Sequence, residues 1–206
     1  MLMLTNKAFI FDLDGVIIDS ETWWDKLYFQ KDGHSLGQTI ESAYQEVKKT
    51  DPNLSWDKYL SKLKRQAKII YNQAPLTPGI NKLLTKLIKN NYHLGLVSGS
   101  TQQWINYVLK RLNYPLDLAI SLHNRQDLKS KPAPDGYLEM MEQLGVKPQN
   151  TIVLEDSNLG IQSGKAAGAF VICLTEHHPI NYHPTGADLY VNSLKELTTK
   201  LDSIQL

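Results

Sequence analysis

Two aspartates close the first apolar stretch of the sequence. Residues 8–11 are apolar and are followed by Asp12-Leu13-Asp14-Gly15. In an extended strand, side chains at positions i and i+2 point to the same side, so both carboxylates of this Asp-x-Asp pattern reach one place. Gly15 lets the backbone turn close to a ligand there. An isolated Asp-x-Asp-Gly is usually a turn, so a chemical role depends on the residues that accompany it.

Polar side chains also follow the later apolar stretches of the chain. They comprise hydroxyl-bearing residues beside a glycine, one loop lysine and two adjacent acids. These residues are Ser98, Gly99, Ser100, Lys131, Glu155 and Asp156. Carboxylates, hydroxyls and an amine are the groups that proteins use to bind phosphate together with a hard cation.

The elements that position these residues are short strands alternating with helices. Apolar runs rich in β-branched residues predict strands at 8–11, 93–97, 116–121, 151–154, 170–174 and, more weakly, 189–191. Helical periodicity lies between most of them, at 81–89, 102–112, 137–144 and 161–167. Such alternation predicts an α/β fold with a parallel sheet covered on both faces.

The predicted sheet brings the polar residues together. In open α/β sheets, ligands bind beyond the carboxyl ends of the parallel strands, so these side chains converge on one rim. Carboxylates packed there repel one another, by about 4 kcal/mol for a pair roughly 4 Å apart at an effective dielectric of 20. Mg²⁺ relieves such repulsion with oxygen ligands. With the lysine and the serine hydroxyl, the rim is typical of a phosphoryl-transfer site.

Residues 20–74 interrupt the alternation of strands and helices. This region is polar, rich in lysine and helical in period, and Pro75-Leu76-Thr77-Pro78-Gly79 ends it. It predicts an all-α cap, inserted after the first strand into a core made of residues 1–19 and 75–206. We expect this cap to cover the rim, with hinges near 19–20 and 74–78. Trp23, Trp24 and Trp56 lie in the cap, where they either build its small core or line the substrate cleft.

The order of these motifs resembles the haloacid dehalogenase superfamily. FDLDGV at 11–16 is similar to the first motif of that family, Ser98 to the second, Lys131 to the third, and Glu155-Asp156 to the fourth. The stretches SKPAPDGY and VLEDSNLGIQSGKAAGA are similar to subfamily IA, the β-phosphoglucomutase-like and sugar-phosphate phosphatase group. The position of the helical insertion matches the cap of that subfamily. The resemblance implies a Rossmann-like core carrying this cap.

The resemblance also implies roles for the four acids. Asp12 would attack phosphorus and form an aspartyl-phosphate. Asp14 would protonate the departing alcohol and then activate the water that cleaves the intermediate. Mg²⁺ would be held by Asp12, the main-chain carbonyl of Asp14, and Asp156, with Glu155 either as a further ligand or as a supporting acid.

Phosphate-binding residues are implied in the same way. The Ser98 hydroxyl and the amides of Gly99 and Ser100 would hold phosphoryl oxygens, and Lys131 would neutralise charge in the transition state. Taken alone, Lys131 is an ordinary loop lysine, and Ser98-Gly99-Ser100 is an ordinary connection from a strand to a helix. Their interpretation as a site depends on the other motifs being present.

Composition narrows the class of protein. The chain has 206 residues, 42% of them hydrophobic and 21% charged, with a net charge of +1. This balance predicts no attraction to nucleic acid or to an anionic membrane. Cys173 is the single cysteine, and the N-terminus lacks a signal-peptide pattern, so we expect a cytoplasmic protein. The sequence leaves the oligomeric state open, and a monomer is the working expectation.

Three functions fit these residues. The leading hypothesis is a Mg²⁺-dependent phosphatase acting on a small phosphorylated metabolite, with sugar phosphates as candidates. A β-phosphoglucomutase-like phosphomutase is the main alternative, but the family uses a cap arginine for a second phosphate. Here Gly33-His34-Ser35-Leu36 holds no arginine, and Arg65 is the only arginine of the cap. The third hypothesis, a non-catalytic protein that binds a phosphorylated metabolite, is disfavoured by the intact motif set.

Two further patterns have structural interpretations. Gly160, Gly164 and Gly168 recur every four residues, which predicts close packing of a helix on the sheet. His177, His178 and His183 lie in a proline-containing stretch without a matched set of metal ligands, so a plain loop is expected there.

Overall fold

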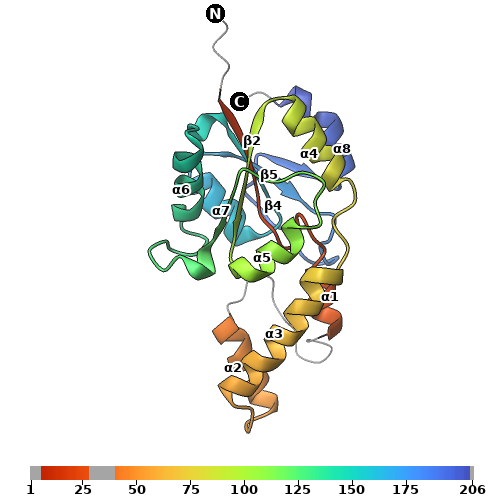
Figure 1. The fold of residues 1–206 in the computed structure, drawn as a ribbon, viewed down its shortest axis with the longest axis vertical. Coiled ribbons are helices and arrows are strands. Elements are labelled where there is room, and N and C mark those ends of the chain that lie inside the picture. Colours follow the sequence, from red (N-terminus) through yellow and green to blue (C-terminus); the bar gives the residue numbers. More distant parts are fainter. Residues whose placement is uncertain (1–5, 28–39, 205–206) are drawn as a thin grey trace, which may run out of the picture.

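A parallel sheet of six strands forms the centre of the molecule (Figure 1). The computed structural model of the chain describes residues 6–27 and 40–204. Every strand pairs in parallel with its neighbours, in the order β3-β2-β1-β4-β5-β6. The strands are β1 (Lys7–Phe11), β2 (Tyr92–Ser98), β3 (Leu118–Ser121), β4 (Thr151–Glu155), β5 (Phe170–Leu174) and β6 (Leu189–Val191). The predicted α/β fold is therefore confirmed.

The register of the central strands places their carboxyl ends level with one another. Phe11 at the end of β1 pairs with Leu96 of β2 and with Leu154 of β4. The residues that follow these strands therefore meet at one edge of the sheet, as the sequence predicts.

Helices cover both faces of the sheet (Figure 1). α4 (Ile80–Lys89), α5 (Gln102–Leu109) and α8 (Leu194–Lys200) pack with Phe9 and Phe11 of β1 in one apolar cluster. α6 (Asp135–Leu144) and α7 (Asn158–Ala166) pack with Ala8 and Ile10 in the other. The split follows from the strand geometry, because successive side chains of β1 point to opposite faces. Three 3₁₀ turns complete the core: η1 (Leu122–Asn124), η2 (Pro148–Asn150) and η3 (Leu201–Ser203).

The helices differ from the sequence-based expectations at their ends. α5 stops at Leu109 because the chain tightens there: the Arg111 amide donates to Val108 O at 2.9 Å. α7 starts three residues earlier than its periodicity indicates, at Asn158, because Ser157 Oγ accepts from the Gly160 amide at 3.0 Å and caps the helix.

The cap consists of helices in the described residues between β1 and α4. They are α1 (Glu21–Leu27), α2 (Ile40–Thr50) and α3 (Trp56–Gln73), and they lie beyond one end of the sheet (Figure 1). Tyr44 of α2 packs on Trp56 and Tyr59 of α3, with ring centroids 4.9 and 5.2 Å apart. In its described residues, the cap inserted after the first strand is all-α, as predicted, and Trp56 belongs to its core. The limits 20 and 74 stay a prediction.

The two linkers between core and cap run side by side. The Asp19 amide donates to Pro75 O at 3.0 Å, and the Thr77 amide donates to Ile17 O at 2.9 Å. His177 lies against both linkers, with Nε2 3.1 Å from Thr77 Oγ1 and Nδ1 3.8 Å from Asp19 Oδ2. The cap therefore leaves and re-enters the core at one point.

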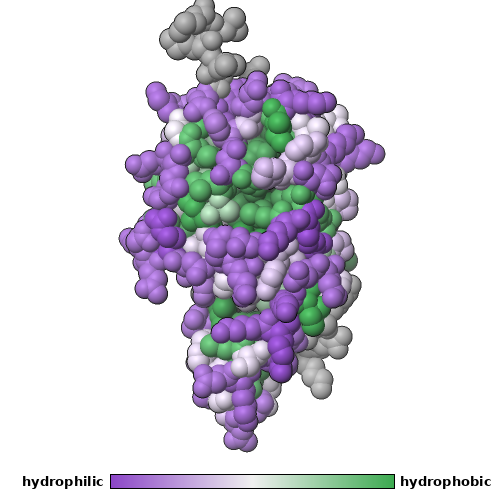
Figure 2. Space-filling view, viewed as in Figure 1, coloured by the Kyte–Doolittle hydropathy of each residue, from purple (hydrophilic) through white to green (hydrophobic). Residues whose placement is uncertain are grey.

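The surface in Figure 2 is mostly hydrophilic, with an apolar band across the core between α4 and α6. Within the described ranges, every helix is too short or too polar to cross a membrane. Cys173 is a free thiol buried in β5, as its place in a predicted core strand indicates.

Candidate active site

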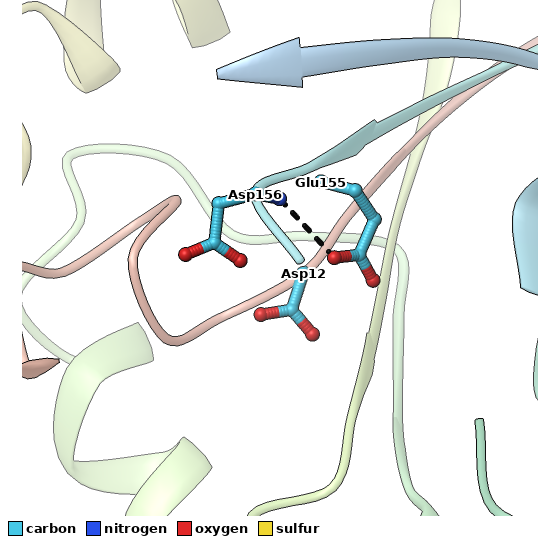
Figure 3. Close-up of side chains that lie close together, drawn as sticks. All are labelled: Asp12, Glu155 and Asp156. Carbon is cyan, nitrogen blue, oxygen red and sulfur yellow. Dashed lines mark hydrogen bonds between the residues drawn. The ribbon is translucent and has the colours of Figure 1, made fainter. Parts of the chain in front are cut away.

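A charged cluster lies at the carboxyl ends of β1 and β4; we use this name for Asp12, Lys131, Glu155 and Asp156. Asp12 directly follows β1, Glu155 ends β4 and Asp156 comes next. One carboxylate oxygen from each of these three acids lies within 4.8 Å of the others. Figure 3 shows the three carboxylates side by side, with a hydrogen bond from the Asp156 amide to Glu155 at 3.2 Å.

Lys131 enters this cluster from the loop between η1 and α6. Its Nζ is 2.5 Å from Asp12 Oδ1 and 2.5 Å from Glu155 Oε1, and it donates to Val97 O at 3.1 Å. Only 12% of the Lys131 side chain is exposed. The sequence marks Lys131 only as a loop lysine within a motif, and the structure places its ammonium group on the first aspartate.

Glu155 is fully buried and held on both oxygens. Oε1 accepts from Lys131 and from the Tyr137 hydroxyl at 2.7 Å, and Oε2 accepts from Ser157 Oγ and from the Asp156 amide, both at 3.2 Å. Of the two roles that the resemblance leaves open for Glu155, these contacts favour the supporting acid, because they direct its carboxylate toward Lys131.

Two glycines make room for the acids. Gly15 has φ +74°, and a Cβ there would lie 1.9 Å from Asp156 Oδ2. A Cβ on Gly160 would lie 1.9 Å from the Glu155 carboxylate carbon. Gly164 lets α7 pack closely on the sheet as predicted, since a Cβ added there would lie 2.8 Å from Val171 of β5. Gly160 therefore serves the site, although its spacing in the sequence indicates only packing.

Burial and mutual repulsion set the protonation of the cluster. Burial, with the nearby charges of Glu155 and Asp14, raises the pKa of Asp12 to about 7 although Lys131 opposes the shift. Burial likewise raises the pKa of Asp156 well above its usual range. Burial by itself would lower the pKa of Lys131, but the carboxylates of Asp12 and Glu155 outweigh it and raise that pKa well above its usual range. If all three acids were ionised, they would carry more negative charge than one lysine balances. A divalent cation would offset that charge, and it fits this set of oxygen donors.

A hydroxyl cluster surrounds the second aspartate; we use this name for Ser20, Tyr71 and Ser100. Asp14 Oδ1 accepts from Ser20 Oγ at 2.6 Å and from Tyr71 Oη at 2.8 Å, and Oδ2 accepts from Ser100 Oγ at 2.7 Å. Tyr71 Oη and Ser100 Oγ are 3.0 Å apart. Both side-chain oxygens of Asp14 are thus engaged by neutral donors, which leaves its main-chain carbonyl for the predicted metal contact.

The loop after β2 supplies the expected phosphate-binding residues. Ser98 is buried, and its Oγ accepts from the Ser100 amide at 3.0 Å. The Ser98 hydroxyl proton stays available to a phosphate oxygen, whereas the Ser100 amide predicted for that role already has a partner. Gly99 lines the cavity beside them, and an added Cβ there would meet nothing within 4 Å. Thr101 then caps α5 by accepting from the Trp104 amide at 3.3 Å.

A cavity of about 400 Å³ joins both clusters to the cap. Its wall includes every sequence-predicted site residue except Glu155, which lies behind Lys131. All three cap helices contribute to it: Glu21 and Trp24 from α1, Ile40, Glu41 and Ala43 from α2, and Tyr59, Leu63 and Tyr71 from α3. The cap therefore lies over the rim as predicted.

Three residues of the site could not be predicted from the sequence patterns. Tyr137 supports Glu155, Ser20 and Tyr71 hold Asp14, and none of them is marked by a motif of polar residues at a strand end. Ser20 follows Asp19, where the sequence indicates only a hinge. For Tyr71 the sequence contains no usable signal, because its contact with Asp14 joins residues 57 positions apart.

Comparison with known proteins decides the family. A family model described as haloacid dehalogenase-like hydrolase matches residues 6–168, which contain both clusters. The chain belongs to this hydrolase family. All four motifs of the haloacid dehalogenase-like pattern therefore lie in the matched region.

Relatives within the haloacid dehalogenase-like family span almost the whole chain. β-Phosphoglucomutase of Bacillus subtilis is 30% identical over an alignment covering 95% of this chain and 93% of the relative. Hexitol phosphatase B of Escherichia coli is 29% identical over an alignment covering 94% of this chain and 95% of the relative. The crystal structure of a putative β-phosphoglucomutase from Thermotoga maritima has a TM-score of 0.79 at 21% identity, covering 97% of this chain and all of that one. At that identity the structure supports the fold alone.

Proposed function

We propose that this protein is a Mg²⁺-dependent phosphatase that hydrolyses a small phosphorylated metabolite, with sugar phosphates as candidate substrates. The observation that carries the proposal is the difference in surroundings between the two aspartates of the Asp-x-Asp pair. Asp12 lies in the charged cluster beside Lys131, whereas Asp14, two residues later, lies in the hydroxyl cluster. Dehalogenases of this superfamily lack the second aspartate, so its presence favours a phosphate ester over a haloacid.

In the first half of the reaction, a carboxylate oxygen of Asp12 bonds to phosphorus as the bond to the alcohol oxygen breaks. The departing oxygen takes the bonding electrons and a proton from Asp14. In the second half, water attacks the phosphorus, its proton passes to Asp14, and phosphate leaves with Asp12 restored. Lys131 and the Ser98 hydroxyl stabilise the charge on the phosphoryl oxygens.

The donor set of the charged cluster fits Mg²⁺. Asp12, the Asp14 carbonyl and Asp156 would hold it, with Glu155 beside them as the supporting acid that holds Lys131. When bound, the cation would offset the repulsion between an anionic nucleophile and a phosphate dianion.

The phosphomutase alternative is supported by the Bacillus subtilis relative. Against it, Lys131 is the only lysine or arginine among the described residues that line the cavity, and Arg65 is exposed on α3 outside its wall. Residues 33–36, which lack the arginine used for a second phosphate, lie outside the described ranges. A site that grips one phosphate favours hydrolysis.

A substrate panel tests the proposal. Phosphate release from hexitol, hexose and nucleoside monophosphates is measured with MgCl₂ and with EDTA, for the wild type, Asp12→Asn and the exposed control Asp51→Asn. We expect release that requires Mg²⁺, a loss of at least about 10⁴-fold in Asp12→Asn and none in the control.

Other outcomes point elsewhere. Conversion of a hexose 1-phosphate to the 6-phosphate that depends on a bisphosphate activator would identify a phosphomutase. Tight binding of a phosphorylated metabolite without release from any substrate would identify a binding protein.

A further inference from the structure

Tyr71 is a cap residue inside the reaction centre. It lies in the last turn of α3, is 2% exposed, and donates its phenol proton to Asp14 Oδ1 at 2.8 Å. The other donors to Asp14, Ser20 and Ser100, come from the linker and from the loop after β2. Among the described residues, Tyr71 is thus the one donor to Asp14 that comes from a cap helix.

The Tyr71 side chain and main chain are both held against the core. Its ring stacks on Trp104 of α5, with centroids 5.2 Å apart and planes 19° apart, and Trp24 meets it edge-on at 6.3 Å. Arg111, just beyond α5, donates to Tyr71 O at 3.0 Å and to Ala74 O at 2.6 Å. These contacts fix the phenol oxygen relative to the core, so it can orient a carboxylate.

We propose that Tyr71 is a positioning residue for Asp14, through which the cap takes part in protonating the leaving group. This inference rests on the proposed phosphatase function. Tyr71 and Ser20 together fill the acceptor positions of Oδ1. Within the part of the chain that the structure describes, Oδ2 has one donor, Ser100, and keeps room for a proton. Oδ2 is therefore the atom that carries the proton to the departing alcohol oxygen as the phosphorus–oxygen bond breaks. Without the phenol, the carboxylate rotates more freely and this proton is delivered less often.

A series of leaving groups isolates this role. p-Nitrophenolate departs without a proton. Departure depends more on protonation for phenolate and most for benzyl alkoxide, while the three phosphate esters are close in size. For Tyr71→Phe, which keeps the stack on Trp104, we expect kcat/KM to fall at least about tenfold with benzyl phosphate. The loss with phenyl phosphate is intermediate, and with p-nitrophenyl phosphate it stays below about threefold. All assays contain MgCl₂.

Tyr44→Phe is the matched control. It also removes a cap phenol, which donates to Leu54 O at 3.0 Å and does not line the cavity. We expect kcat/KM to stay unchanged with all three substrates. A loss in Tyr71→Phe that is equal for the three esters would overturn the inference and leave the phosphatase standing, because damage to cap packing does not depend on the leaving group. A wild type that releases phosphate neither from these three esters nor from any member of the substrate panel would overturn both the inference and the proposed function.

Discussion

Asp12 and Asp14 are separated by one residue, yet their surroundings differ in kind. Asp12 lies among charges, with Lys131 at 2.5 Å and two further acids nearby. Asp14 accepts three hydrogen bonds from neutral hydroxyls. The charged cluster comes from the core alone, whereas the hydroxyl cluster combines core, linker and cap. Environment, and not sequence position, therefore suits these two identical side chains to the different roles proposed for them.

We expect the largest effect on activity and stability at Lys131. Lys131→Met leaves Asp12 and Glu155 without their buried cation, so we expect kcat to fall about 10²- to 10³-fold and the free energy of unfolding to fall by about 3 kcal/mol. Steady-state kinetics and urea unfolding measure these effects. Lys129→Met, at an exposed position of the same loop, is the control. Equal stability of the two variants would show that the ion pairs contribute nothing to folding.

The pH dependence of stability tests the charged cluster without mutating Lys131. Because the pKa of Asp12 is about 7 in the folded protein against 3.8 ordinarily, the folded state binds more protons between these values. Without divalent cations, the free energy of unfolding should therefore fall as pH rises from about 4 to 7, by an amount on the order of 3 kcal/mol. Asp156, whose pKa is also raised, acts in the same direction.

Urea unfolding across this pH range measures the effect. Asp12→Asn should flatten the slope, and MgCl₂ should stabilise the wild type most near pH 7, where the acids are ionised. A wild-type slope that survives unchanged in Asp12→Asn would assign it to other groups.

Gly160 and Gly99 differ in the space around an added Cβ, so they test how tightly the charged cluster is packed. Gly160→Ala places a methyl group on the buried Glu155 carboxylate, and we expect a loss of about 2 kcal/mol in unfolding free energy with reduced activity. Gly99→Ala has open space around its Cβ, so its stability should change by less than about 0.5 kcal/mol. Thermal unfolding compares the two, and an equal response would mean that Glu155 moves aside at little cost.

The hydroxyl cluster should respond more weakly than the charged cluster. Ser20→Ala removes one neutral donor while Tyr71 and Ser100 remain, so we expect about a threefold loss of kcat and about 1 kcal/mol of stability. The exposed Ser203→Ala serves as control. A loss as large as that of Lys131→Met would erase the distinction between the two clusters.

Most of the core and the charged cluster could be predicted because local patterns encode them. Strand periodicity and the parallel topology bring Asp12, Ser98 and Asp156 to one rim, whichever helices cover the sheet. The position of Tyr71 could not be predicted in this way, since it depends on how α3 packs on Trp104 and Arg111. Gly160 was hidden for a different reason: its spacing satisfies helix packing, and only the path of the Glu155 side chain shows its second role.

The paired linkers give the core a seam at which one insertion could be exchanged for another. Asp19 and Pro75 are joined by a hydrogen bond of 3.0 Å, so a segment of different length could enter and leave there without disturbing the sheet. Such an exchange would carry the charged cluster over intact, because no residue of it lies in the insertion. It would also discard Tyr71. Diversification of this scaffold would therefore preserve the proposed nucleophile, and each new lid would have to evolve its own means of orienting the proposed proton donor.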